Sequence, residues 1–246
     1  MNEFQVVALI QARMGSTRLP GKSLKEVMGK PLLGYLVERV RRCKKLNDIV
    51  IATTDSPVDD CLARFARNEN LSFFRGSEID VLDRFYQAAT LFKADVVVRI
   101  TGDCPLIDPV VVDEAISYFL DQYPLYDYVN NIAPRRYPRG MDTEVFTYQA
   151  LLETWKRAGS NSEREHVTPF IYLHPELFRL GHVSCKEDLS SHRWTVDTPE
   201  DFALVKKILE YLYPKNPEFT IQDILRALCK NPEWVQINAH IQQKSL

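Results

Sequence analysis

The chain has 246 residues, of which 45% are hydrophobic and 26% charged, as in an ordinary globular protein and unlike a disordered or collagen-like one. Its 31 Lys and Arg against 33 Asp and Glu give a net charge of −2, which argues against a nucleic-acid binder because such domains are usually strongly basic. A single domain over residues 1–246 is large enough to fold without disulfides or a structural metal.

Neither the cysteines nor the amino terminus indicates export. The five cysteines are odd in number and form no Cys-x-x-Cys pair, which is typical of free thiols in a reducing compartment. The apolar run at residues 6–10 is too short for a signal peptide or a membrane span. We therefore expect a cytoplasmic protein that binds neither membranes nor nucleic acid.

Strand-like and helix-like segments alternate along the first half of the chain. Short β-branched runs predict strands buried on both faces, at residues 4–11, 48–54, 71–75 and 95–101. Apolar spacing and capping residues predict helices between them, at 31–46, from Ser56-Pro57 onward with Asp59 closing a capping box, at 81–92, and from Asp108-Pro109 to 122. This alternation predicts an α/β fold with a mostly parallel, Rossmann-like sheet flanked by helices.

The second half is less regular between residues 127 and 183, and we interpret that segment as a lobe over one edge of the sheet. It contains strand candidates at 128, 144–148 and 178–183 and helix candidates at 149–158 and 163–173. The regular pattern returns with a strand at 193–197, a helix from Thr198-Pro199 to 213, and a helix at 220–230.

The loop after the first predicted strand carries the densest cluster of chemically useful residues. Residues 11–22 offer three cations, two hydroxyls and two glycines. Ligands of open α/β sheets bind beyond the carboxyl ends of strands, and glycine-rich backbone with Arg and Lys suits a polyphosphate. The loop is not a Walker loop, because five residues rather than four separate Gly15 from Gly21 and Pro20 restricts the backbone. The alternative is a plain exposed basic loop, which the position after the first strand makes less favoured.

Two aspartates, Asp103 and Asp197, each follow a predicted strand. A parallel sheet can bring both to one rim, where they would hold Mg²⁺ together with substrate phosphates. Either alone is weak support, because aspartates often end strands. For Asp108, which precedes a proline, a helix cap is the favoured interpretation.

These segments resemble the cytidylyltransferase family, which activates acidic sugars such as 3-deoxy-manno-octulosonate and acylneuraminate, and above all its spore-coat polysaccharide biosynthesis protein F branch. The resemblance covers about residues 6–212. It is carried by Ala-Arg-Met-Gly-Ser-Thr-Arg-Leu-Pro-Gly-Lys at 12–22, Ala-Thr-Thr-Asp at 52–55, Thr-Gly-Asp-Cys-Pro-Leu-Ile-Asp at 101–108 and Arg-Trp-Thr-Val-Asp-Thr-Pro-Glu-Asp at 193–201, with support from 74–84 and 162–169.

The resemblance implies a nucleotide-diphospho-sugar transferase fold and a Mg²⁺-dependent reaction of CTP with a sugar-like acid, releasing pyrophosphate, for surface polysaccharide biosynthesis. Arg13, Lys22 and Asp103 would be catalytic, and Asp103 and Asp197 would bind the metal. The nucleotide site implied comprises Leu9, Gln11, Ala12, Arg13, Gly15, Ser16, Arg18, Lys22, Arg75 and Arg84, with backbone groups near 9–12 reading the base.

By their side-chain chemistry, the residues expected to bind the acceptor are Arg139, Asp142, Glu144, Arg164 and His166, and the resemblance implies a homodimer formed through the segment 127–183. For two of these positions an alternative without acceptor binding stays open: a solvated basic turn around Arg139 and a surface position for His166. The chain has Thr-Gly-Asp-Cys-Pro where the sugar-acid enzymes have Gln-Gly-Asp-Glu-Pro or similar, which leaves the identity of the acceptor open.

Two other functions compete with this one. A glycosyltransferase would use a ready-made nucleotide sugar, but such enzymes usually carry Asp-x-Asp after a strand, whereas Asp103 is followed by Cys-Pro. A non-catalytic nucleotide-binding subunit is less favoured because both Asp103 and Asp197 are present.

Overall fold

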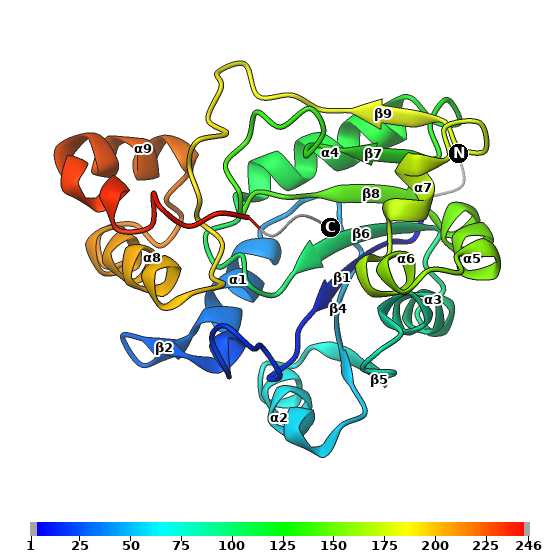
Figure 1. Ribbon diagram of the computed structural model, residues 1–246, viewed down its shortest axis with the longest axis horizontal. Helices are drawn as coiled ribbons and strands as arrows, with labels where there is room; N and C mark the ends of the chain where they lie inside the picture. The colour runs from blue at the N-terminus through cyan, green and yellow to red at the C-terminus, as the bar shows by residue number, and fades with distance from the viewer. Residues whose placement is uncertain (1–3, 244–246) are drawn as a thin grey trace.

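A seven-stranded sheet forms the centre of the protein in this computed structural model, which describes residues 4–243 (Figure 1). The strand order is β5-β4-β1-β6-β8-β7-β9. The strands are β1 (Val6–Gln11), β4 (Asp48–Thr54), β5 (Ser72–Gly76), β6 (Val96–Thr101), β7 (Tyr128–Asn130), β8 (Glu144–Thr147) and β9 (Leu180–His182). A small separate hairpin pairs β2 (Glu26–Val27) with β3 (Lys30–Pro31).

The strands β5, β4, β1 and β6 are all parallel, whereas β8 runs antiparallel to both β6 and β7. This arrangement confirms the predicted α/β class with a mostly parallel sheet. The segment 127–183 does not lie over the sheet edge as expected. It supplies three further strands, β7, β8 and β9, that extend the same sheet.

Helices cover both faces of the sheet. Successive residues of a strand point to opposite faces, and in the central strands the residues on both faces are mostly apolar. On one face, Val6, Ala8 and Ile10 pack against α1 (Leu32–Val40), α2 (Asp60–Asn68) and α4 (Pro109–Asp121). On the other, Val7 and Leu9 pack against three more helices, α3 (Val81–Leu91), α5 (Tyr148–Arg157) and α7 (Pro169–Leu173), with the short α6 (Asn161–His166) beside α3.

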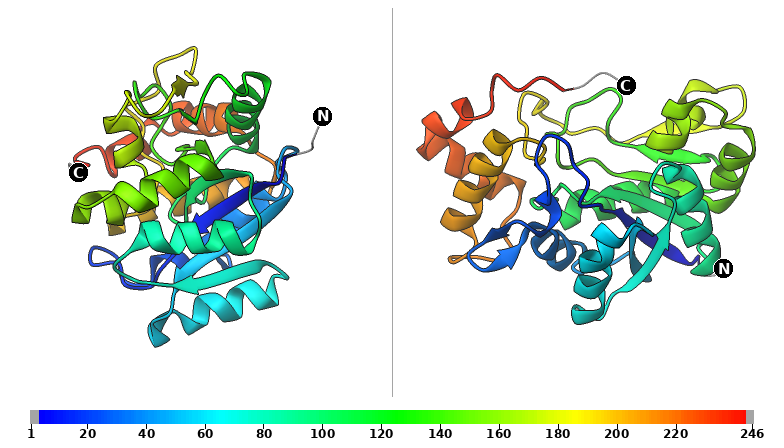
Figure 2. Two further views of the ribbon diagram at one scale, coloured as in Figure 1. Left: turned by 90° about the vertical axis from the view of Figure 1, so that its right-hand side faces the viewer. Right: turned by 60° about the horizontal axis from the view of Figure 1, so that its bottom comes forward.

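The carboxyl-terminal helices α8 (Pro199–Leu212) and α9 (Ile221–Lys230) lie together at one end of the molecule, at the left of Figure 1 and again in the right-hand view of Figure 2. They form a third apolar cluster around the fully buried Trp194 and Tyr35. Within the described part of the chain, no helix has the length and apolar composition needed to cross a bilayer.

The strand predicted at 193–197 is wrong. Arg193 makes one isolated bridge, to Arg139. Trp194 donates its backbone N–H to Arg139 at 2.7 Å, but Val196 donates to the carbonyl of Asp103 at 2.8 Å. Because the segment pairs with two different stretches of chain in turn, no continuous ladder forms.

The helix predicted at 163–173 is divided into α6 and α7. Val167 lies between them with φ +73°, a region that β-branched residues rarely adopt. Pro169 then begins α7, because a proline lacks the N–H that would continue the preceding helix. Similarly, α1 is shorter than the predicted helix and begins after Pro31, which is its N-cap.

The capping box predicted for Ser56 and Asp59 is also wrong. Ser56 makes no side-chain capping bond. The buried carboxylate of Asp59 instead accepts hydrogen bonds from the backbone N–H of Met14, at 2.7 Å, and from the hydroxyl of Thr54. Asp59 therefore fastens the loop after β1 to the neighbouring strand β4.

Candidate active site

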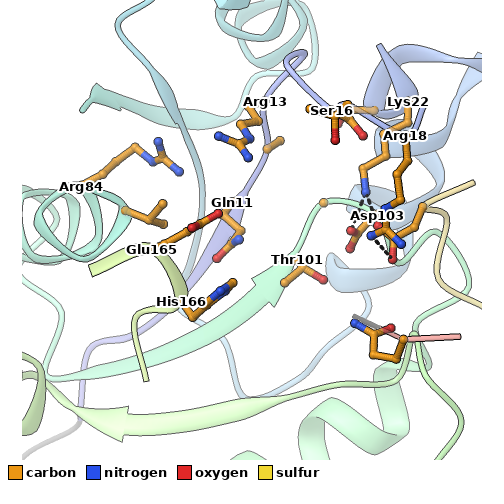
Figure 3. A pocket seen from close by; sticks show the side chains of 17 residues that line it. Gln11, Arg13, Ser16, Arg18, Lys22, Arg84, Thr101, Asp103, Glu165 and His166 are labelled. Carbon is orange, nitrogen blue, oxygen red and sulfur yellow. Dashed lines mark hydrogen bonds and ion pairs between the residues drawn. The ribbon is translucent and has the colours of Figure 1, made fainter. Parts of the chain in front are cut away.

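A cavity of about 580 Å³ opens at the carboxyl ends of β1 and β6 (Figure 3). The basic loop after β1 forms one wall, and Asp103 and Asp197 lie at its base. The opposite wall carries Arg84 from α3 and Glu165 and His166 from α6. The position of this cavity agrees with the rule that open α/β sheets bind ligands beyond the carboxyl ends of their strands.

Lys22 joins the two aspartates at the base of the cavity. Its Nζ lies 2.7 Å from Asp103 Oδ2 and 2.8 Å from Asp197 Oδ1, and Arg18 lies 3.2 Å from Asp197. Burial alone would raise the pKa of Asp103, but the Lys22 ammonium outweighs it and holds that pKa well below its usual range. In the same way, burial alone would lower the pKa of Lys22, but the two carboxylates outweigh this effect and raise that pKa.

Asp197 is held in place by a buried ion-pair network behind it. Arg193 donates to Asp197 Oδ2 at 2.7 Å and to Asp201 Oδ1 at 2.9 Å. Asp201 is fully buried and also accepts the backbone N–H of Asp197 at 3.0 Å. Because a forked guanidinium bridges both carboxylates, Asp197 reaches the cavity without belonging to a strand.

The backbone of the basic loop is fixed around Met14. The carbonyl of Met14 accepts N–H groups from Ser16 at 2.9 Å and Gly21 at 3.0 Å, and Gly21 adopts φ +69°. At the base of the loop, a Cβ on Gly102 would lie 2.7 Å from the carbonyl oxygen of Gln11. Glycine is therefore required where the ends of β1 and β6 approach each other.

Arg84 adds positive charge on the opposite wall. Its side chain is buried, and burial together with the nearby Arg13 lowers its pKa to about 10. One nitrogen donates to the carbonyl of Ser77 at 2.7 Å, while Nε has no partner within residues 4–243. A buried guanidinium with an unused donor at a cavity wall is suited to an anionic ligand.

The structure brings together most of the predicted nucleotide-binding residues, and it places three elsewhere. The cavity is lined by Gln11, Ala12, Arg13, Ser16, Arg18, Lys22 and Arg84. Leu9 is buried in the core, Gly15 is exposed outside the lining, and Arg75 pairs with Asp60 at 2.7 Å.

Two of the backbone groups expected to read the base are already paired within the sheet. The carbonyl of Gln11 accepts the N–H of Gly102 at 2.8 Å, and the N–H of Ala12 donates to Ala52 at 3.3 Å.

Of the five predicted acceptor-binding residues, His166 alone lines this cavity. Arg164 pairs with Asp80 at 3.0 Å, and Asp142 forms a two-bond pair with Arg135 at 2.6 and 2.9 Å. Glu144 is buried in the sheet. Arg139 lines a second cavity of about 610 Å³ together with Tyr172 and His182.

Sequence reasoning missed several residues of the site. Glu165 and Gln243 line the cavity, but Gln243 lies in no recognisable motif. Asp59, Arg193 and Asp201 support the site from behind. Their roles depend on long-range side-chain partners, and only Asp201, three positions after Thr198, carries a local signal as part of a capping box.

The donor set fits Mg²⁺. Within residues 4–243, no group of three or more His, Cys, Asp and Glu side chains could hold a metal by itself. Mg²⁺, however, is usually bound by one or two carboxylates plus substrate phosphates. Asp103 and Asp197 already converge on a single cationic group, the Lys22 ammonium, and further cations of the basic loop line the same cavity.

Comparison with known proteins gives consistent results. A family model described as Cytidylyltransferase matches residues 7–231. The chain is 39% identical over 243 residues to an uncharacterized protein of Methanocaldococcus jannaschii, covering 98% of this chain and 97% of that protein. It is 35% identical over 235 residues to the spore coat polysaccharide biosynthesis protein SpsF of Bacillus subtilis, covering 93% and 95%.

A 3-deoxy-manno-octulosonate cytidylyltransferase of Geobacter metallireducens is 34% identical over 113 residues, which is 46% of this chain and 44% of that enzyme. Among solved structures, a cytidylyltransferase from Leptospira borgpetersenii superposes with a TM-score of 0.91 at 34% identity, covering 99% of this chain and 100% of that one.

Proposed function

The chain belongs to the cytidylyltransferase family, and we propose that it transfers CMP from CTP to a small sugar acid with release of pyrophosphate. The observation that carries this proposal is the convergence of Lys22, Asp103 and Asp197 beside the basic loop. The name of the Bacillus subtilis relative supports a role of the product in polysaccharide synthesis. The extent of the domain and the homodimer stay predictions.

In this reaction an oxygen of the acceptor attacks the α-phosphorus of CTP, and the bond to pyrophosphate breaks. Arg13, Ser16, Arg18 and Lys22 would bind the triphosphate, and Arg84 would add charge from the opposite wall. Mg²⁺ held by Asp103 and Asp197 would neutralise charge on the phosphates. Cations fixed in place before the reaction stabilise the leaving group without having to reorganise.

The acceptor would bind beside His166 and Thr101. Burial lowers the pKa of His166 below its ordinary value, and Glu165 only partly opposes this effect. This shift favours the neutral imidazole, which can hydrogen-bond sugar hydroxyls. Arg139 lines the second cavity, so a contact between it and the acceptor is not part of this proposal.

Pyrophosphate release tests the proposal directly. Purified protein with Mg²⁺ is given CTP, UTP, ATP or GTP together with 3-deoxy-manno-octulosonate, N-acetylneuraminate or glucuronate. We expect pyrophosphate from CTP with a sugar acid, and at least a hundredfold lower rate for Asp103→Asn, as is typical for loss of a group that acts on the transferring phosphate. Asp121→Asn, on an exposed position of α4, is the matched control.

Two outcomes would contradict the proposal. Transfer of sugar from a ready-made nucleotide sugar without pyrophosphate release would indicate a glycosyltransferase. Selective binding of CTP with no turnover of any sugar acid would indicate a non-catalytic nucleotide-binding subunit.

A further inference from the structure

Glu144 is the centre of a buried hydrogen-bond network between the sheet and α7. It begins β8 and is 2% exposed. One carboxylate oxygen accepts the hydroxyls of Tyr128 and Thr168, each at 2.6 Å, and the other accepts Nη1 of Arg99. Three donors therefore occupy this carboxylate, so Glu144 is not free to bind a substrate.

Arg99 lies directly opposite Glu144 in the pairing of β6 with β8. While Nη1 donates to Glu144, Nε donates to Oε1 of Gln11 at 3.2 Å. A planar guanidinium can hold two acceptors in a fixed geometry, which a lysine ammonium cannot do. The network thus extends from a buried carboxylate to a side chain that lines the cavity.

This contact determines how the Gln11 amide is oriented. An arginine has only donors, so it selects the carbonyl oxygen of Gln11 and not the NH₂ group. The NH₂ group is then the end of the amide that is left for a ligand. In Figure 3, the Gln11 side chain lies away from Ser16, Arg18 and Lys22, on the side of the cavity that carries Glu165 and His166.

The two parts of the cavity differ in charge. The part formed by the basic loop carries three cations and suits phosphates. The part around Gln11 carries an amide donor, the Thr101 hydroxyl, the Glu165 carboxylate and an imidazole whose pKa burial lowers, with the Arg84 guanidinium on the same wall as Glu165 and His166. Neutral donors beside a carboxylate suit the hydroxyl oxygens of a ligand.

We propose that Gln11 is a specificity-determining residue that donates a hydrogen bond from Nε2 to an oxygen of the acceptor, and that Arg99 and Glu144 are its positioning residues. The inference rests on the proposed function, because it assumes that a sugar acid occupies the part of the cavity around Gln11. Glu144, expected from the sequence to contact the acceptor, acts through Arg99 instead.

Steady-state kinetics of Arg99→Lys, Gln11→Met and the double variant test this inference, with CTP, Mg²⁺ and 3-deoxy-manno-octulosonate as the probe. Lysine keeps the positive charge beside Glu144 but loses the hydrogen bond to Gln11, so we expect the Arg99→Lys protein to fold. Each single variant should raise KM for the sugar acid about five- to tenfold, the effect of one neutral hydrogen bond, with the Kd for CTP unchanged within about twofold.

The double variant should be no worse than Gln11→Met alone, because Arg99 acts through Gln11. The matched controls are Arg226→Lys and Gln222→Met, at exposed positions of α9, and neither should change KM. Additive effects of the two substitutions, or an equal loss of CTP affinity, would overturn the inference.

A second measurement separates this inference from the proposed function. The side-chain amide resonances of Gln11, assigned by their loss in Gln11→Met, should report a rigid amide in the wild type and a mobile one in Arg99→Lys. An amide that is equally mobile in both proteins overturns the positioning role even if the enzyme is active. If the wild type uses no sugar acid, the proposed function and the assigned ligand of Gln11 fail together, while the amide data still decide whether Arg99 positions Gln11.

Discussion

The Nζ atom of Lys22 lies 2.7 Å from Asp103 Oδ2, so a cation from the loop after β1 neutralises a carboxylate that follows β6. The same ammonium reaches Asp197, which comes from the irregular segment before α8. The three charged groups that meet here therefore come from three separate stretches of the chain. Four predictions concern the contacts that hold these stretches in place.

The first prediction concerns acid stability. Lys22 holds the pKa of Asp103 below its usual range, whereas an unfolded aspartate titrates near 3.9. The pair therefore contributes stability that is present above about pH 4 and is lost as the pH falls from there toward the folded pKa. The unfolding free energy, measured by urea unfolding between pH 2.5 and 6, should fall less steeply toward acid pH in Asp103→Asn than in the wild type. An unchanged slope, equal to that of Asp121→Asn, would contradict this.

The second prediction concerns the anchor of the basic loop. Asp59→Ala removes the acceptor for the N–H of Met14 and the hydroxyl of Thr54. Leaving the buried Thr54 hydroxyl and the part-buried Met14 N–H unpaired should cost about 2–4 kcal/mol of unfolding free energy and should raise the Kd for CTP, measured by calorimetry. Asp60→Asn, at an exposed neighbouring position, is the control. Normal CTP affinity in Asp59→Ala would show that the loop does not depend on this anchor.

The third prediction compares two glycines. A Cβ at Gly102 would lie 2.7 Å from Gln11 O and 3.0 Å from Ala12 Cβ, whereas one at Gly159 meets nothing within 4 Å. Gly102→Ala should destabilise the protein by about 1–3 kcal/mol and weaken CTP binding. Gly159→Ala should be neutral or stabilising by up to about 1 kcal/mol. Thermal unfolding with and without CTP measures both the stability and the binding of CTP. Equal stability and equal stabilisation by CTP in the two variants would refute the prediction.

The fourth prediction concerns the pair behind Asp197. Arg193→Met leaves the fully buried Asp201 without its guanidinium partner, which should cost about 3–5 kcal/mol of unfolding free energy. The urea midpoint should fall with an unchanged m value. Arg226→Met removes an exposed pair and should change stability by less than about 0.5 kcal/mol. A comparable loss of unfolding free energy in both variants would mean that the burial of an ion pair does not determine how much its removal destabilises the protein.

Much of the fold follows from local patterns in the sequence. The apolar runs of β1, β4 and β6 are long enough to predict strands, and the caps of α4 and α8, Asp108 and Thr198, both precede prolines. The proximity of Asp103 and Asp197 was also predictable. The reason given for it was partly wrong, because ion pairs with Arg193, and not a strand, hold Asp197 in place.

The rest could not be predicted because it depends on register and on long-range side-chain partners. From the sequence, Glu144 was expected to bind the acceptor, yet the antiparallel register of β8 places it opposite Arg99 and buries it. Asp59 has the spacing of a capping residue, yet its carboxylate bonds to Met14, 45 positions away. Such partners exist only after the strands have paired.

The separation of the partners of Lys22 also has a consequence for biosynthesis. Asp103 lies 81 residues and Asp197 175 residues beyond Lys22. At a translation rate of about 5–20 residues per second, the second aspartate is made roughly 5–20 s after the first. During that interval a nascent chain carries the basic loop, with its Lys22, and only one of the two carboxylate partners of Lys22. The complete site is therefore acquired late in synthesis, after the strands that frame it have been made.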